Sequence, residues 1–553
     1  MRWHSNRNQG GEGNRFASPE RQRYARQVSF VPLGGVLIYF GKGPQLRNIT
    51  MRLMSTDYHR LHGPRRFEKS RAVVVAIAIG VFATCPAAVG ATLDWHGGID
   101  RNWSTPSNWL GNTLPVSGSP NLEVRIGAGS AGPLISTQDL GMPFELQQLT
   151  FENDDPFKPQ TVTGNPIAFS NLGAAPRIDD QIFNSTISLT IDADVVLNAD
   201  LLVKASQSFG AARTQMYLNG AISGIGGVEQ IGGGDLFFGG AEPNSYAGMT
   251  KSTVGYLFLQ KPASVVAIPG DLYVDRVNGS QTRSGRVYIM NDNQIASAST
   301  VTLNSATLYV EGGDQTLANV RFTGENLDFI NADGGNVVIS PSRTLTITDG
   351  ITRTWLNNNL TTTSAITGGT LNLNGGLRSI RVDNGDFFWP RTELTISSNI
   401  VNGDIAKTGT GDLVLEGSFS GSLIANEGLL RTTLQLTFGL NDGGISNRIS
   451  GSSEAEIAGT FVIDSSSLTA ISGSWNLVDV ANLNETFNSG LKVRLASGVA
   501  LTKVGSTYKA GRWEFSTTDG NLTLAAPEPS ALLLAMAVGV VPVLFSRRRL
   551  QRA

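Results

Sequence analysis

A short strand motif bounded by glycines occurs twice in this chain and constrains its fold most. Residues 232–239 read Gly-Gly-Gly-Asp-Leu-Phe-Phe-Gly, and residues 409–417 read Gly-Thr-Gly-Asp-Leu-Val-Leu-Glu-Gly. Leu413 and Leu415 are two residues apart, so they point to the same side of a strand. One short strand cannot bury that side alone, whereas strands stacked at about 4.8 Å bury it in a continuous column. The motif therefore predicts a parallel β-helix, or β-solenoid, over residues 152–440.

Weaker copies of the same pattern lie between the two motifs. In one of them Leu345 and Ile347 repeat the two-residue spacing. The weaker copies are residues 299–303, 306–310, 336–339, 343–348 and 369–373. The fold class expected from these strands is all-β, a parallel solenoid of short repeat strands with a C-terminal antiparallel β-sheet module and a terminal transmembrane helix. A solenoid also needs a cap at each end, because its edge strands are open there.

The two strong copies resemble a known repeat family. Residues 217–259 and 399–430 share glycine-led strands, and the first copy continues as Tyr-Ala-Gly-Met-Thr at residues 246–250. This pattern resembles the autotransporter-associated β-strand repeat. The resemblance implies a parallel β-helix of the kind found in secreted passenger domains.

The residues before the repeats, 92–151, are expected to form an N-terminal cap. Trp95, Trp103 and Trp109 lie close together there, two of them in Asn-Trp pairs. Flat rings with polar edges suit sugar faces, so the three tryptophans form a candidate sugar-stacking platform. The favoured interpretation is a plug that buries the open end of the stack, since terminal repeats of solenoids are atypical.

The residues after the repeats, 445–525, alternate polar and apolar residues more regularly. Strands at this spacing are typical of a small antiparallel sheet or sandwich. We therefore expect a C-terminal β module, with Trp475 and Trp513 in its core.

The end of the chain has the composition of a sorting signal. Pro527, Glu528 and Pro529 are followed by an uncharged run at residues 531–545. A basic cluster follows that run: Arg547, Arg548 and Arg549. A 15-residue helix covers about 22 Å, less than the ~30 Å core of a bilayer, and the arginines should stay cytoplasmic.

Residues 527–550 resemble the PEP-CTERM sorting signal of bacterial exopolysaccharide-associated proteins. The resemblance implies a transmembrane helix at 531–545 and cleavage near Pro527 by an exosortase, a membrane transpeptidase-like enzyme. The alternative is an ordinary C-terminal single-pass anchor, which is usually nearer 20 residues long.

A secretory signal peptide is predicted at residues 54–91. Basic residues at 65–71 precede the apolar run 72–82, and small residues end at Ala91, the expected cleavage position. Residues 1–53 have no clear helical or strand period, and we interpret them as a disordered extension or a misassigned start.

The ectodomain between the two signals, residues 92–526, is acidic and poor in reactive side chains. It holds 25 basic and 40 acidic residues, a net charge of about −15. This charge argues against nucleic acid as a partner. Cys85 lies before the cleavage position, and His96 is the one histidine after it. Thiolate chemistry is therefore excluded, and a zinc site or a catalytic triad needs His96.

Carboxylates are the remaining candidates for chemistry. The candidate acids Asp235, Asp386, Asp412 and Glu416 occur singly in turns, and Asp235 and Asp412 occupy the same place in the repeat. A residue that recurs with the repeat serves its geometry, so we expect no catalytic residue and no cofactor. Calcium at residues 154–155 or 192–194 is possible chemically, but solvated turns are the commoner explanation.

We therefore expect a non-enzymatic protein, secreted or displayed at the cell surface, with a structural or adhesive role in the extracellular matrix or cell envelope. Its expected partners are signal peptidase and an exosortase, extracellular polysaccharide as a possible ligand, and the inner membrane through residues 531–545 before cleavage. The alternative is a β-helix protein that binds or degrades polysaccharide.

Overall fold

The computed structural model describes residues 91–127, 134–152, 158–181, 186–207, 213–276, 285–324, 334–354, 363–384, 393–445 and 447–528. The chain divides into two compact units, Met1–Phe82 and Ala83–Ala553, and all described residues belong to the second. Among them, no helix is both long and apolar enough to span a bilayer. The expected segments 1–53 and 531–545, and the signal peptide apart from Ala91, lie outside the described residues.

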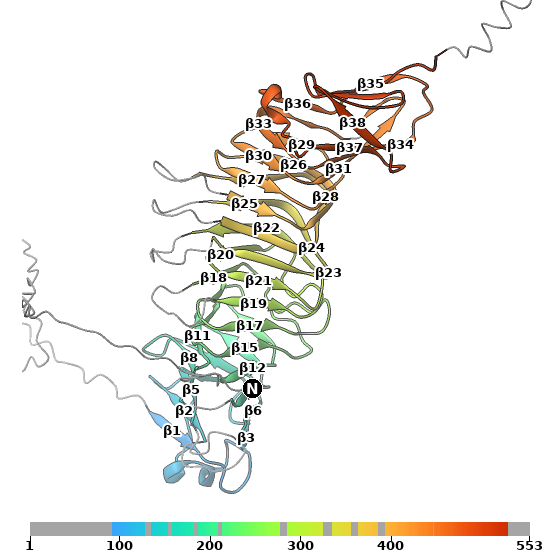
Figure 1. The fold of residues 1–553 in the computed structure, drawn as a ribbon. Helices are drawn as coiled ribbons and strands as arrows, with labels where there is room; N and C mark the ends of the chain where they lie inside the picture. The colour runs from blue at the N-terminus through green and yellow to red at the C-terminus, as the bar shows by residue number, and fades with distance from the viewer. Residues whose placement is uncertain are drawn as a thin grey trace, which may run out of the picture. The chain divides into compact units, whose positions relative to one another are not determined.

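The second unit is an all-β structure whose main part is a parallel solenoid of about 12 turns (Figure 1). Successive strands fall on three faces, and each strand pairs in parallel with strands of the turns before and after it. The first and second faces together form a 27-stranded sheet. This confirms the parallel solenoid predicted from the repeats.

The first face runs from the first strand of the stack, β1, to β36 near its C-terminal end. Its strands are β1 (Thr92–Trp95), β2 (Glu123–Ile126), β5 (Gln148–Phe151), β8 (Arg177–Asp180), β11 (Leu201–Lys204), β14 (Val228–Gln230), β16 (Thr250–Ser252), β18 (Leu272–Asp275), β20 (Thr300–Asn304), β29 (Leu423–Ala425) and β36 (Val478–Ala481).

The second face follows the first in each turn. Its strands are β3 (Leu134–Gln138), β6 (Gln160–Gly164), β9 (Ser188–Ile191), β12 (Gln215–Leu218), β15 (Asp235–Phe238), β17 (Tyr256–Leu259), β19 (Arg286–Ile289), β21 (Thr307–Val310), β25 (Glu393–Ile396), β27 (Asp412–Leu415) and β30 (Leu429–Thr432).

The third face closes each turn. Its strands are β4 (Phe144–Leu146), β7 (Ile167–Phe169), β10 (Val195–Leu197), β13 (Ile222–Gly224), β28 (Ser418–Phe419), β31 (Gln435–Asn441), β34 (Thr460–Ser467) and β37 (Lys492–Leu495). Five longer strands bend from one face to the next: β22 (Gln315–Thr323), β23 (Asn336–Arg353), β24 (Thr363–Val382), β26 (Asn399–Thr408) and β33 (Ile449–Ile457).

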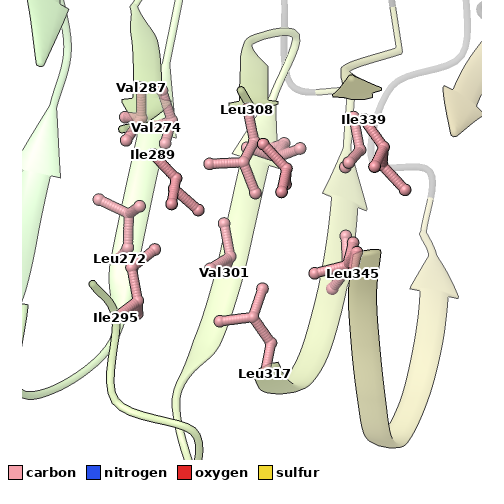
Figure 2. Close-up of a cluster of buried hydrophobic side chains, with 14 of the residues drawn as sticks. Leu272, Val274, Val287, Ile289, Ile295, Val301, Leu308, Leu317, Ile339 and Leu345 are labelled. Atoms are coloured by element: carbon pink, nitrogen blue, oxygen red, sulfur yellow. The ribbon is translucent and has the colours of Figure 1, made fainter. Parts of the chain in front are cut away.

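The interior is a set of apolar ladders that run from turn to turn. On the first face Leu272 pairs with Val301, and Val301 pairs with Val320. Figure 2 shows Leu272, Val301 and other branched aliphatic side chains gathered between the faces. Leu413 and Leu415 are fully buried, as are Leu345 and Ile347. The two-residue spacing seen in the sequence therefore marks the inward side of each strand.

The corners between faces depend on glycines and on carboxylates. Gly409 has a φ of 76°, and a Cβ there would lie 2.5 Å from the carbonyl oxygen of Val382. Only glycine fits such a close approach in the left-handed region. Corner aspartates accept hydrogen bonds from the backbone of the next turn, as Asp194 does from Ala221 N–H at 2.8 Å and Asp271 from Thr300 N–H at 2.8 Å.

The sequence predicts that the solenoid gives way to an antiparallel module near residue 445, and the strand pairing at the C-terminal end differs from this expectation. Parallel pairing continues past that residue, from β30 to β33 and from β31 through β34 to β37. Among the named strands of the described residues, antiparallel pairing occurs in two short regions. One is the hairpin of β31 with β32 (Gly444–Ile445). The other is the end of the stack, where each strand pairs with the next in the order β37, β38, β39, β40, β41 and β35. The new strands are β38 (Ala500–Val504), β39 (Thr507–Ala510), β40 (Trp513–Ser516), β41 (Asn521–Leu524) and β35 (Gly473–Asn476). The antiparallel module exists, but it is smaller than expected and continues the solenoid directly.

Candidate functional sites

The three N-terminal tryptophans form a plug. Trp95, Trp103 and Trp109 are all buried, in the segment that holds the short 3-10 helices η1 (Pro106–Asn108) and η2 (Leu110–Asn112). The Trp109 indole N–H donates to the Trp103 carbonyl oxygen at 2.7 Å, and the two rings meet edge to face at 5.8 Å. Because no face of these rings is open to solvent, they are no platform for sugars. Their burial supports the plug interpretation over the sugar-stacking platform.

Of the two tryptophans expected in the core of the C-terminal module, only Trp475 is buried. Trp475 is buried and its ring centroid lies 6.0 Å from that of Trp513, which is half-buried. Phe461, Phe487 and Phe515 contact one another edge to face and form the better-buried aromatic cluster of this end. α1 (Leu483–Thr486) immediately precedes Phe487.

The two repeat carboxylates occupy equivalent places, and each forms an ion pair with an arginine of a neighbouring turn. Asp235 begins β15 and accepts from Arg213 at 3.1 Å, and Asp412 begins β27 and lies 3.1 Å from Arg431. Both aspartates are buried. Arg431 also contacts Glu456 at 3.0 Å and lies 3.8 Å from Glu393. These carboxylates therefore neutralise arginines of neighbouring turns, and this role stabilises the fold.

The candidate calcium ligands are hydrogen-bonded within the protein. Asp192 accepts from the Asn219 side-chain amide at 2.9 Å, one turn later, and Asp194 from the Ala221 backbone N–H. The described part of the chain holds no group of three or more His, Cys, Asp or Glu side chains that could bind a metal ion. Residues 154–155 and Asp386 lie outside the described residues, and Glu416 is exposed at the end of β27.

Two lysines are buried at corners, which the sequence did not indicate. Lys261 Nζ donates to the carbonyl oxygens of Gly239 at 2.5 Å and Glu242 at 2.8 Å. Lys407 Nζ donates in the same way to Gly409 at 2.5 Å and Glu427 at 2.9 Å. Burial lowers the pKa of each ammonium group to about 8. Each lysine therefore ties two turns together at a cost in desolvation.

An outward column of aromatic rings crosses five turns of the second face. The aromatic column consists of the third residue of each of five strands: Tyr217, Phe237, Phe258, Tyr288 and Tyr309. Successive ring centroids are 4.4, 4.6, 4.8 and 4.6 Å apart, and neighbouring rings lie within 13° of parallel. The neighbours of these residues in each strand point into the core, so the column lies on the outside.

Stacking of the rings determines which parts of the aromatic column are open to solvent and to a ligand. Each ring covers the faces of its neighbours, so the column presents ring edges and the tyrosine hydroxyls to solvent. Burial raises the pKa of Tyr217 and of Tyr288 further above neutral pH, where a tyrosine hydroxyl is already protonated. Beside the column, the Tyr256 ring lies between Arg213 and Arg286, whose guanidinium carbons are 4.9 and 5.2 Å from its centroid. Such contacts contribute about 0.5–1 kcal/mol each.

The processing signals lie largely outside the described residues. Ala91 is exposed, and its carbonyl oxygen accepts from Glu123 N–H at 3.0 Å, at the start of the β1–β2 pairing. Pro527 and Glu528 are exposed and follow β41 without regular structure. Pro529, the apolar run 531–545 and the arginines 547–549 are not among the described residues.

Comparisons with known proteins identify no relative. No protein-family model matches the chain, no curated protein matches it, and no solved structure matches it.

Proposed function

We propose that this protein is an exported, non-enzymatic β-solenoid, sorted by an exosortase and serving a structural or adhesive role in the extracellular matrix or cell envelope. Signal peptidase acts after Ala91, and residues 531–545 hold the precursor in the inner membrane until the chain is cut near Pro527. The PEP-CTERM and repeat resemblances of the sequence support this order of events.

One observation carries the structural role: the recurring polar side chains are used to join one turn to the next. Asp235 and Asp412 neutralise arginines, Asp192 and Asp194 bind the following turn, and Lys261 ties corner carbonyl groups. A catalytic carboxylate needs a position that differs from turn to turn and a pKa suited to proton transfer. A carboxylate that recurs with the repeat and forms an ion pair with an arginine instead stabilises the packing of neighbouring turns.

Cell fractionation tests the proposal. The protein should be found outside the cytosol, and replacing Pro527, Glu528 and Pro529 by alanine should leave export intact while the uncut precursor accumulates in the inner membrane. A matched triple substitution to alanine at the exposed residues Asn484, Glu485 and Ser489 controls for general effects on folding. If the triple-alanine protein is released at the normal rate, residues 527–529 are not a sorting signal.

The aromatic column supports a second candidate function, the binding of polysaccharide. Tyrosine hydroxyls and ring edges combine hydrogen bonding with apolar contact, as ligand surfaces require. Glycan-array binding by the purified protein tests it. Binding should fall when Phe258 is replaced by alanine and persist when Val414, an outward residue on the same face, is replaced. Equal binding by both variants removes the aromatic column as the ligand site.

A further inference from the structure

The exposed large apolar side chains concentrate at the two ends of the solenoid. Of the twelve in the described residues, five lie in residues 92–151, and four of these, Ile99, Leu110, Val116 and Met142, keep 66–78% of their surface exposed. This group is called the N-terminal apolar group. Three more lie at the opposite end, where Ile471, Val499 and Val504 keep 51–65% exposed. They are called the C-terminal apolar group. Enrichment of exposed apolar side chains at the two ends makes these ends the candidate interaction surfaces.

The pairing order places these groups at opposite ends of the stack. β1 is the first strand of the first face, and the N-terminal apolar group lies in the segments around it. β37 is the last strand of the third face, and β38 to β41 follow it as the antiparallel end. Arg512 NH1 donates to the Ile471 carbonyl oxygen at 2.9 Å, which joins residue 471 to this same end.

The two ends carry opposite charge. Residues 92–151 contain five acidic and two basic residues, a net charge of −3. Residues 471–524, which hold the C-terminal apolar group, contain five basic and four acidic residues, a net charge of +1, and the basic excess lies in residues 492–524, which hold β37 to β41 and carry a net charge of +3. Two copies that meet through like ends would oppose charges of the same sign, whereas unlike ends attract.

We propose that the protein associates head to tail, with the N-terminal apolar group of one copy packed against the C-terminal apolar group of the next. A contact between unlike ends is not closed by a two-fold axis, so it propagates into a linear filament. The filament extends the direction in which the turns already stack. An anionic membrane is the poorer partner for the N-terminal end, because that end is itself negative.

The inference rests on the proposed function in one respect: removal of the residues before Thr92 and beyond the cut near Pro527 leaves both ends free. The rest depends on the solenoid alone. A chain that stays in the cytosol yet forms head-to-tail oligomers would overturn the export proposal and leave this inference standing.

Sedimentation velocity with two blocked variants tests the inference. The protein is purified from cells in the form that accumulates, and mass spectrometry records its termini. Leu110→Asp places a charge in the N-terminal apolar group, and Val504→Asp does the same in the C-terminal group. Each should weaken self-association by at least about tenfold, because an unpaired carboxylate is costly to bury. Leu377→Asp, an exposed position on β24 between the ends, is the matched control and should associate as the wild type does.

Mixing the two blocked variants distinguishes the possible geometries. Each variant keeps one intact end, so the mixture should form a 1:1 dimer and nothing larger. High salt should weaken both this dimer and the wild-type filament. Met142→Asp and Ile471→Asp repeat the test at independent positions, with thermal unfolding as the check on folding. A wild type that stays monomeric at all concentrations, or a mixture that stays monomeric, overturns the inference. A Val504→Asp variant that associates as fully as the wild type also overturns it, because that result indicates contacts between like ends.

Discussion

Replacing Leu413 by aspartate should disrupt the solenoid locally. Leu413 is fully buried on β27 and pairs with Leu394 on β25 and Leu430 on β30, which are also buried. Removing a buried leucine side chain costs about 2–5 kcal/mol. Placing an unpaired carboxylate in the same position adds several kcal/mol or forces its protonation. The sum is comparable to the whole stability of a typical domain, about 5–15 kcal/mol.

The damage should stay near the substitution, because each turn of a solenoid contacts mainly its neighbours. Hydrogen exchange with mass spectrometry should show lost protection in β25, β27 and β30 and normal protection in β5 to β9. Val414→Asp is the matched control, because Val414 points outward on the same strand, beside Arg431. Its protection should match the wild type.

The introduced carboxyl group also predicts a pH dependence. Burial raises its pKa in the folded protein above the ordinary value of about 3.9. The folded state then binds the proton more tightly than the unfolded state, so the penalty grows as the pH rises above about 4 and is smallest below it. Unchanged protection in β25, β27 and β30 at neutral pH would refute the inward register of Leu413.

Three further predictions test other parts of the structure. Trp103→Ala should lower the free energy of unfolding by about 3–5 kcal/mol, measured by denaturant titration, and an unchanged midpoint would contradict the plug. Phe258→Leu removes two ring stacks at 4.6 and 4.8 Å, so stability should fall by about 1–3 kcal/mol, whereas Val414→Leu on the same face should be nearly neutral. The pKa of Lys261 is lowered to about 8, so the folded state binds fewer protons than the unfolded state above that pH. The wild type should therefore gain stability relative to Lys261→Met between about pH 8 and pH 10, and a thermal-unfolding difference that is constant across this window would contradict the burial of the ammonium group.

The solenoid itself was predictable because its signal is local. The spacing of Leu413 and Leu415, and of Leu345 and Ile347, marks the inward side of a strand whatever the strand pairs with. The tryptophan plug was predictable from the general need of a stack to close its end. Both expectations depended on residues close together in the sequence.

The aromatic column was missed because its members are spaced unevenly. Tyr217, Phe237, Phe258, Tyr288 and Tyr309 occupy one register position in successive turns, yet the turns differ in length. The connection from the first to the second face spans residues 276–285 between β18 and β19 but only residues 253–255 between β16 and β17, so no fixed period appears in the sequence. The expected boundary at 445 was displaced for another reason. Alternation along β33 and β34 shows that each strand has one buried side, but it does not encode whether the partner strand is parallel or antiparallel.

Buried charges were missed because burial of a lysine depends on tertiary contacts. Lys261 follows β17 and Lys407 lies near the end of β26, at positions that sequence patterns assign to solvent. Their partners are backbone carbonyl groups of the same corner and of a neighbouring turn, 19 to 22 residues away for Lys261. The side-chain pattern cannot predict which backbone carbonyl groups will accept these hydrogen bonds, because every residue carries a carbonyl group.

The central claim is that the protein is exported and cut at both ends, leaving the solenoid as the mature product. Mass spectrometry of the terminal peptides, on protein purified from the cells that make it, tests this claim most directly. The account predicts a mature N-terminus at Thr92 and a C-terminus within residues 527–529. Recovery of a single species that retains residues 72–91 and ends at Ala553 would contradict it.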